Sequence, residues 1–136
     1  MALTFPSDEW IKALQVKINA SPDYAEAAKT WEGDFYFYVE PDGALKDTTV
    51  LYLDLWHGQC RDARLVSDET AKKPAYTIRA SLSSWEKVVL GQLEPIQAIM
   101  TRKLRLEGDL VQVMRSVKAA SELIRCCTQV ETVFPA

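Results

Sequence analysis

The sequence predicts an α+β domain with two layers, in which helices cover one face of a mainly antiparallel sheet of about five strands. Two observations lead to this prediction. Apolar residues recur at helical spacing near both ends of the chain, whereas residues 34–80 alternate apolar and polar side chains as strands do. Such strands leave one face that needs cover, and the single apolar stripe of each helix can supply it. With 136 residues, the whole chain 1–136 is expected to form one domain around one core.

Serine residues mark the starts of two helices at the N-terminal end. Ser7 precedes two acidic residues, so its hydroxyl can cap a helix whose first turn favours negative charge. Ser21 precedes Pro22, and proline suits the first helical position because that N–H has no partner in the helix anyway. Gly33 is expected to close this second helix, since glycine adopts the left-handed conformation readily.

Four strands are expected in the alternating stretch. The second, TTVLYLDLWH, places three leucines on one face and Tyr52, Asp54 and Trp56 on the other. Asp54 identifies the solvent side, because an unpaired carboxylate is costly in a core. A turn at residues 41–43, which are Pro-Asp-Gly, joins the first two strands. The expected strand ranges are 34–40, 48–57, 60–66 and 75–80.

Capping and turn residues divide the next part of the chain. Ser83 and Glu86 have the spacing of a capping box, which predicts a helix that starts there and ends at Gly91. Proline then opens a short helix over residues 95–102. Residues 103–107 alternate basic and apolar side chains, as a short one-sided strand does.

The last part of the chain is expected to be one long helix capped by Asp109. Its apolar stripe is predicted to run along Leu110, Val113, Met114, Val117, Ser121 and Ile124. Its solvent face is predicted to carry Arg115, Lys118, Glu122 and Arg125.

Composition and charge exclude several classes of partner. The net charge of −3 and the pI near 5.2 give no electrostatic basis for binding nucleic acid. No stretch approaches the roughly 18 consecutive apolar residues of a membrane-spanning helix, so stable membrane insertion is not expected. The first residues lack the basic and apolar regions of a secretory signal, and a cytoplasmic location is therefore the expectation.

Residues that commonly carry catalysis or bind metals are scarce. Cys60, Cys126 and Cys127 have neither disulfide nor metal-ligand spacing and are expected to be buried thiols. The one histidine, His57, lies on the opposite face of an ideal strand from Asp54, which works against a catalytic pair. No nucleophile elbow or phosphate-binding loop is found. No metal or cofactor is predicted, and the chain is not expected to be an enzyme.

An ordered set of residues resembles the sterol carrier protein-2 family of lipid-binding domains. These residues are Thr77-Ile78, Ser83-Ser84-Trp85, Gly91, Pro95, Ala98, Lys103-Leu104-Arg105-Leu106 and Gly108-Asp109. The resemblance covers residues 33–127 as a family-like core, with residues 1–32 as additional N-terminal helices. One position departs from the family pattern, because Arg102 stands where the family has a glycine before the short strand.

The resemblance implies a tunnel between sheet and helices that binds a fatty acyl chain, an acyl-CoA or a sterol-like lipid. The short helix 95–102 is then expected to act as a mobile lid, because two turns are too short to be stable without packing. The same apolar residues could instead fill a solid core. The residues expected to bind the ligand are Trp85, Val89, Leu93, Ile96, Ile99, Met100, Leu104, Met114 and Val117.

The aromatic face of the sheet and the basic side chains each allow more than one interpretation. An interaction module with a filled core would form a homodimer through an aromatic sheet face, made of Tyr36, Tyr38, Tyr52 and Trp56. Basic side chains at residues 72–73 and 102–105 would contact a lipid headgroup or a CoA phosphate, or would simply be solvated.

Overall fold

The computed structural model describes residues 2–135, and its main sheet has the strand order β4-β3-β2-β5-β6. β2 pairs with β5 in parallel, and every other neighbouring pair is antiparallel. The predicted α+β class and mainly antiparallel sheet are therefore confirmed. The strands are β2 (Glu32–Glu40), β3 (Thr49–Trp56), β4 (Gln59–Leu65), β5 (Tyr76–Ser81) and β6 (Arg105–Glu107).

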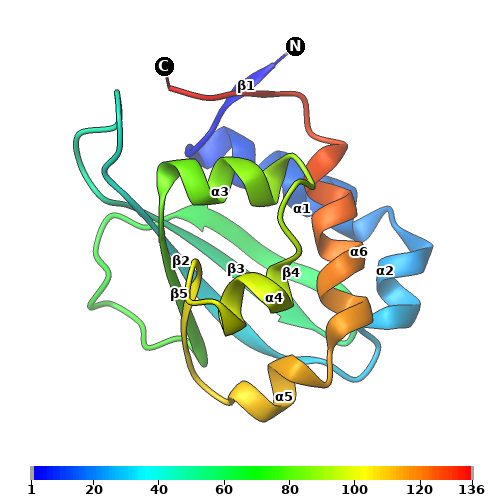
Figure 1. Ribbon diagram of the computed structural model, residues 1–136. Helices are drawn as coiled ribbons and strands as arrows, with labels where there is room; N and C mark the ends of the chain where they lie inside the picture. Colours follow the sequence, from blue (N-terminus) through cyan, green and yellow to red (C-terminus); the bar gives the residue numbers. More distant parts are fainter. Residues whose placement is uncertain (1, 136) are drawn as a thin grey trace.

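The helices gather on one side of this sheet (Figure 1). They are α1 (Asp8–Asn19), α2 (Pro22–Ala27), α3 (Leu82–Val89), α4 (Pro95–Met100), α5 (Leu110–Met114) and α6 (Val117–Thr128). Two short strands, β1 (Leu3–Thr4) and β7 (Thr132–Val133), pair in parallel and bring the two ends of the chain together. Two residues per strand are too few for an alternating pattern, so the sequence did not predict this pair. Within residues 2–135, no helix is long and apolar enough to cross a membrane.

Several predicted caps are confirmed by their hydrogen bonds. The Ser7 hydroxyl accepts from the Trp10 N–H at 3.1 Å, and the Ser21 hydroxyl accepts from the Tyr24 N–H at 3.1 Å. Gly91 has a φ of 74° directly after the C-cap of α3, which is the conformation that favours glycine at a helix end.

Two boundaries differ from the prediction. The cap of α3 is Ser81, whose hydroxyl accepts from the Ser84 N–H at 3.3 Å, so the helix begins two residues earlier than the capping-box spacing suggests. α2 ends at Ala27 and is not closed by Gly33. Gly33 lies in β2, where the Tyr76 ring packs so closely that an added Cβ would lie 2.6 Å from its Cε2 atom.

The prediction of one long C-terminal helix is wrong, because this part of the chain forms two helices, α5 and α6, with a break between them. The Ser116 hydroxyl donates to the Gln112 carbonyl oxygen at 2.9 Å, and Ser116 has a ψ of 34°, outside the helical range. The break changes which face of α6 is inward. Glu122, predicted to face solvent, is only 8% exposed, and its Oε1 atom lies 3.6 Å from the Arg125 guanidinium.

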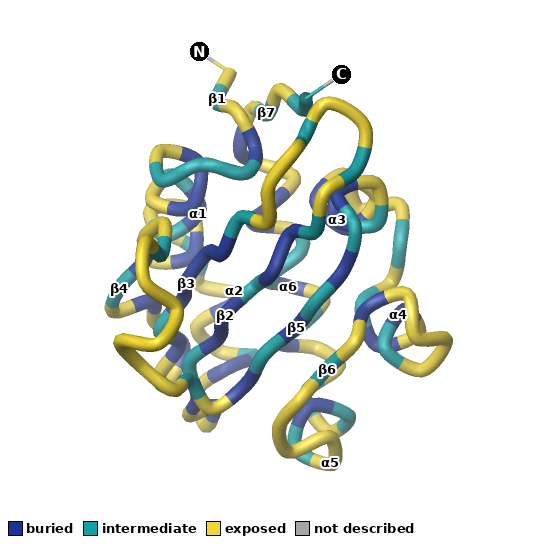
Figure 2. Tube along the Cα trace, turned by 90° about the vertical axis from the view of Figure 1, so that its left-hand side faces the viewer, coloured by how far each residue is buried: buried dark blue, intermediate teal, exposed yellow. Residues whose placement is uncertain are grey.

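The aromatic face of the sheet is covered, so its predicted exposure is wrong. Tyr36, Tyr38 and Tyr52 are buried, and Trp56 alone of the four is exposed. The segment 66–75 crosses this face: Val66 packs on the tyrosines, and the Ala75 N–H donates to the Asp34 carboxylate at 2.7 Å. The guanidinium groups of Arg64 and Arg79 lie over the Tyr52 and Tyr38 rings. Figure 2 shows the central strands largely buried from end to end.

Candidate functional site

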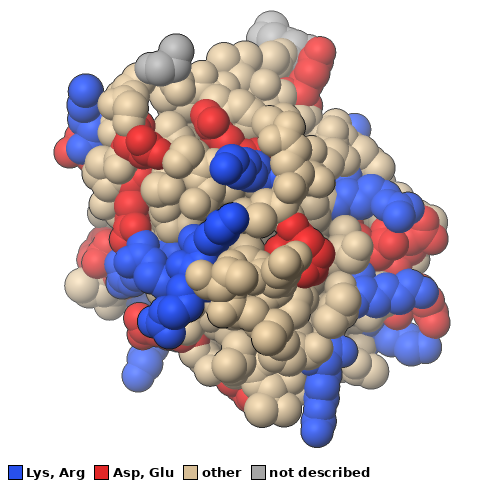
Figure 3. All heavy atoms as spheres, viewed as in Figure 1, with Lys and Arg blue, Asp and Glu red and all other residues tan. Residues whose placement is uncertain are grey.

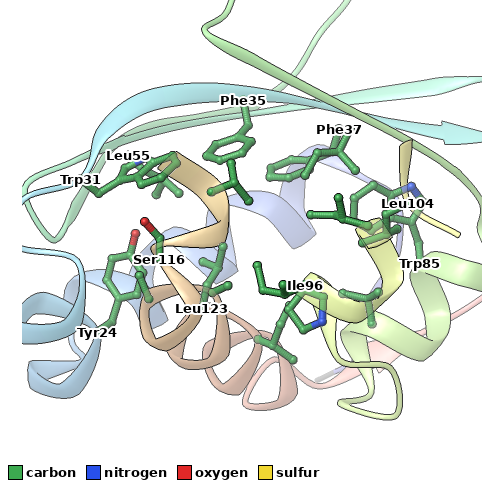
Figure 4. A pocket seen from close by; sticks show the side chains of 18 residues that line it. Tyr24, Trp31, Phe35, Phe37, Leu55, Trp85, Ile96, Leu104, Ser116 and Leu123 are labelled. Carbon is green, nitrogen blue, oxygen red and sulfur yellow. The ribbon is translucent and has the colours of Figure 1, made fainter. Parts of the chain in front are cut away.

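An apolar pocket of about 100 Å³ lies between the sheet and the helices. The sheet contributes inward-facing residues from three strands, and the helices α2 to α6 with the segments that flank them contribute the rest (Figure 4). Phe35, Phe37, Leu55 and Ile78 line the sheet side. The other lining residues are Tyr24, Trp31, Trp85, Val88, Pro95, Ile96, Ile99, Leu104, Val113, Ser116, Ala119, Ala120, Leu123 and Ile124.

A row of aromatic rings forms one wall of the pocket. The Trp31 and Phe35 rings stack with centroids 5.7 Å apart, and Phe35 stacks on Phe37 at 5.3 Å. Phe37 meets Trp85 edge to face at 5.5 Å. The phenylalanines point the same way because residues two apart on a strand share one face. Contacts of this kind fix each ring against its neighbours, so this wall is rigid.

The two tryptophans present only carbon to the pocket, because their N–H groups are engaged elsewhere. The Trp31 indole donates to the Gly33 carbonyl oxygen at 3.0 Å, and the Trp85 indole donates to the Tyr38 carbonyl oxygen at 2.9 Å. Among the described residues that line the pocket, none carries a charge at neutral pH, since burial raises the pKa of Tyr24 far above its usual value. The pocket is therefore suited to hold an apolar molecule.

A second apolar pocket, of about 50 Å³, lies next to the first on the side of α1. Its lining includes Phe5, Trp10 and Leu14 from the N-terminal part of the chain. Five side chains line both pockets and separate the two spaces. The shared residues are Phe37, Trp85, Val88, Leu123 and Ile124.

The opening of the larger pocket lies between α4 and α6. The lining residues on the sheet are mostly buried, whereas Pro95 and Ile99 on α4 and Ala120 and Leu123 on α6 are partly exposed. Figure 3 shows Lys and Arg side chains gathered on this same face, beside α4.

The predicted basic clusters differ in their partners. Arg105 pairs with the Glu40 carboxylate, and the Lys72 Nζ atom lies 4.0 Å from the Asp34 carboxylate. Arg102 and Lys103 are exposed and form no ion pair within residues 2–135.

The structure brings about half of the predicted ligand-binding residues to the two pockets. Trp85, Ile96, Ile99 and Leu104 line the larger pocket, and Val89 lines the smaller one. Leu93 and Met114 are partly buried against the core without lining either pocket. Met100 and Val117 point outward, with 68% and 48% of their surface exposed. Whether any of these residues binds a ligand stays a prediction.

Sequence reasoning missed the sheet side of the pocket and Tyr24. The alternation that predicted the strands also placed Phe35, Phe37, Leu55 and Ile78 on the helix-facing side, so the signal was present. Tyr24 stands on an apolar helical stripe with Ala27, Ala28 and Trp31, but a stripe does not tell which segment it packs against, and the packing of α2 on α6 joins segments about 100 residues apart.

The histidine and the cysteines do not line the larger pocket, although Cys127 lines the smaller one. The His57 imidazole lies in the turn between β3 and β4, 2.5 Å from the exposed Glu32 carboxylate at the start of β2. Cys60, Cys126 and Cys127 are buried, and burial raises the pKa of the Cys60 and Cys127 thiols to about 12. Within the described part of the chain, no group of three or more His, Cys, Asp and Glu residues could hold a metal ion.

The fold and the site together define the class of protein: an α+β domain with an apolar pocket beneath its helices. The model of the SCP-2 sterol transfer family matches residues 11–121, so the chain belongs to that family. The matched range begins inside α1 and includes α2, which sequence analysis placed before the family-like core.

Solved structures agree with this membership. A crystal structure of sterol carrier protein 2 is 36% identical and covers 91% of this chain and 97% of its own, with a TM-score of 0.79. The solution structure of a conserved hypothetical protein from Thermus thermophilus is 34% identical, covers 92% and 88%, and has a TM-score of 0.81.

A third likeness shows the fold alone. The sec-alkylsulfatase Pisa1 from Pseudomonas sp. is 17% identical, with a TM-score of 0.54, and the match covers 81% of this chain and 15% of the enzyme. No curated protein matched the chain by sequence.

Proposed function

We propose that this protein binds and carries a hydrophobic lipid, most directly one with a fatty acyl chain, between the sheet and the helices. The observation that carries the proposal is the uncharged, aromatic-walled pocket in a chain of the SCP-2 sterol transfer family. Each methylene removed from water contributes about 0.8 kcal/mol, so even a partly buried chain binds measurably.

Loading requires the helices to move. Pockets that enclose small ligands usually measure about 300–1,000 Å³, whereas this one measures about 100 Å³. We propose α4 as the part that yields. It has six residues, and the exposed Met100 shows that part of its surface has no packing partner. Rotamer changes of the aliphatic side chains that line both pockets, Val88, Leu123 and Ile124, then open the second pocket and extend the space into a tunnel.

We propose a carrier rather than an enzyme. The lining of the larger pocket supplies no general base or charged electrophile, and His57 does not line it but pairs with Glu32 in an exposed position. Three buried free thiols are consistent with a reducing compartment, and we place the function in the cytoplasm. We do not extend the proposal to a homodimer, because the tyrosines on which that alternative depended are covered.

The test combines native mass spectrometry of freshly purified protein with a series of fatty acids from eight to sixteen carbons. A carrier should retain a host lipid, and affinity should increase with each methylene until the space is full. Binding costs remove several kcal/mol of the gross gain, so micromolar dissociation constants are expected. An affinity that does not depend on chain length contradicts the proposal.

A further inference from the structure

Two side chains that line the larger pocket, Tyr24 and Ser116, carry hydroxyl groups. The hydrogen bonds that each hydroxyl already forms determine what else it can bind. Tyr24 is 2% exposed, and its hydroxyl forms no hydrogen bond with any described residue. The Ser116 hydroxyl donates to the Gln112 carbonyl oxygen, which leaves its own lone pairs free to accept. Figure 4 shows both oxygen atoms turned toward the pocket at the end beside Trp31.

Buried hydroxyls are nearly always hydrogen-bonded. The Tyr24 hydroxyl oxygen is not among the fully buried atoms without a partner in the described residues, so it keeps access to the pocket that it lines. The surrounding residues do not meet this need. The indole N–H groups of Trp31 and Trp85 are donors and are already engaged with backbone carbonyls. The other lining side chains are hydrocarbon. The Tyr24 hydroxyl is therefore a donor that faces the pocket, where water or the head of a ligand can supply the acceptor.

We propose that this end of the pocket is a subsite for the uncharged oxygen head of a lipid, an alcohol or a ketone, which is bound head first. The Tyr24 hydroxyl donates to the oxygen of the head, and the Ser116 oxygen accepts from the head when it is an alcohol. This inference rests on the proposed lipid-binding function and adds to it the class of head and the direction of binding.

Charge argues against an ionised head at the same place. No cationic side chain among the described residues lines the pocket, and a buried carboxylate without a partner is strongly disfavoured. An ionised fatty acid therefore binds tail first. Its carboxylate then stays at the opening between α4 and α6, where it can remain in contact with water.

The test measures displacement of a dansyl-labelled fatty acid by decan-1-ol, decan-2-one and decanoate at pH 8. Tyr24→Phe should weaken alcohol and ketone about 3- to 10-fold, the value of one hydrogen bond, and should change decanoate less than about 2-fold. Ser116→Ala should weaken the alcohol by a similar factor and leave the ketone unchanged, because a ketone has no proton to donate.

Tyr76→Phe is the matched control, since Tyr76 is buried beside Phe35 without lining the pocket. It should leave all three affinities unchanged. Tyr24→Phe should melt at or above the wild-type temperature, because the lost hydroxyl has no protein partner. Equal weakening of all three ligands by Tyr24→Phe, or of none, overturns the subsite while lipid binding stands. If the wild-type protein binds neither the labelled fatty acid nor any competitor, the proposed function itself fails.

Discussion

The indole N–H of Trp85 donates to the Tyr38 carbonyl oxygen at 2.9 Å and so ties α3 to the central strand β2. The same side chain lines both pockets, so one residue links the fold to the candidate site. Its hydrogen bond fixes the ring in the wall that separates the two spaces, and the Phe37 ring supports it from the sheet.

Trp85→Phe should lower the free energy of unfolding by about 2 kcal/mol, from the lost hydrogen bond and the unfilled space. It should also make the wall thinner and shift the preferred fatty acid to a longer chain. Urea unfolding and the chain-length series measure the two effects. Trp56→Phe is the control, because that ring is 37% exposed and lines neither pocket. An equal loss of stability in both variants would show that the Trp85 hydrogen bond makes no measurable contribution to the free energy of unfolding.

Ile99→Glu should abolish fatty-acid binding and lower the melting temperature only slightly. Ile99 lines the pocket but is partly exposed on α4, so a carboxylate there can reach water once the helix shifts. Met100→Glu makes the same change one residue away, on a side chain that is 68% exposed, and should alter neither property. Global unfolding of Ile99→Glu would instead support a solid core beneath α4.

Local patterns predicted the fold well where a single element determines its own structure. The division of the β3 side chains between two faces and the serine caps of α1 and α2 hold in the structure because they depend on neighbouring residues. The break before α6 did not follow from the pattern, because the Ser116 hydroxyl competes for a backbone carbonyl within an otherwise continuous stripe. The burial of Glu122 is a consequence of that break.

The site was predictable on the helix side and less so elsewhere. Stripes on α3 and α4 pointed to Trp85, Ile96 and Ile99, because one face of each helix must be covered. Met100 was expected at the pocket and lies outside, since a six-residue helix has too few turns for a stripe to fix its rotation. The cover over the outer tyrosines came from segment 66–75, which has no periodic pattern of its own.

Arg102 occupies the position where the family resemblance led us to expect glycine. The backbone conformation at this position explains why glycine is favoured there. Its φ is 63°, and the Lys103 N–H donates to the Ala98 carbonyl oxygen at 2.9 Å, which is the closing bond of a helix C-terminus that favours glycine. Arg102→Gly relieves about 1–2 kcal/mol of left-handed strain against about 0.5–1 kcal/mol of added backbone entropy. The variant should therefore be more stable by up to about 1.5 kcal/mol in urea unfolding. Arg102→Ala removes the same charge but keeps the strain, and should not be stabilised. A gain of equal size in both variants would assign the effect to charge.

The buried thiols and phenols predict that stability falls in alkaline solution. Burial raises the pKa of Cys60 to about 12, and it raises the pKa of Tyr24 and Tyr52 above their usual values. An unfolded thiol has a pKa of about 8.5, so above that pH the unfolded chain loses protons that the folded chain keeps. The free energy of unfolding is then constant below about pH 8 and falls between about pH 9 and pH 12. The slope reaches about 1.4 kcal/mol per pH unit for each such group.

Urea unfolding at half-unit steps from pH 7.5 to pH 10.5 measures this slope. Cys60→Ala keeps a small apolar side chain at the site. It should reduce the slope of the free energy of unfolding against pH by up to about 1.4 kcal/mol per pH unit, the contribution of one titrating group. Thiol-specific reagents give an independent check, because a buried protonated thiol should react only as fast as the protein unfolds. A stability that stays level up to pH 10.5, together with rapid labelling of the folded protein, would mean that these thiols titrate in the folded state as they do in the unfolded chain.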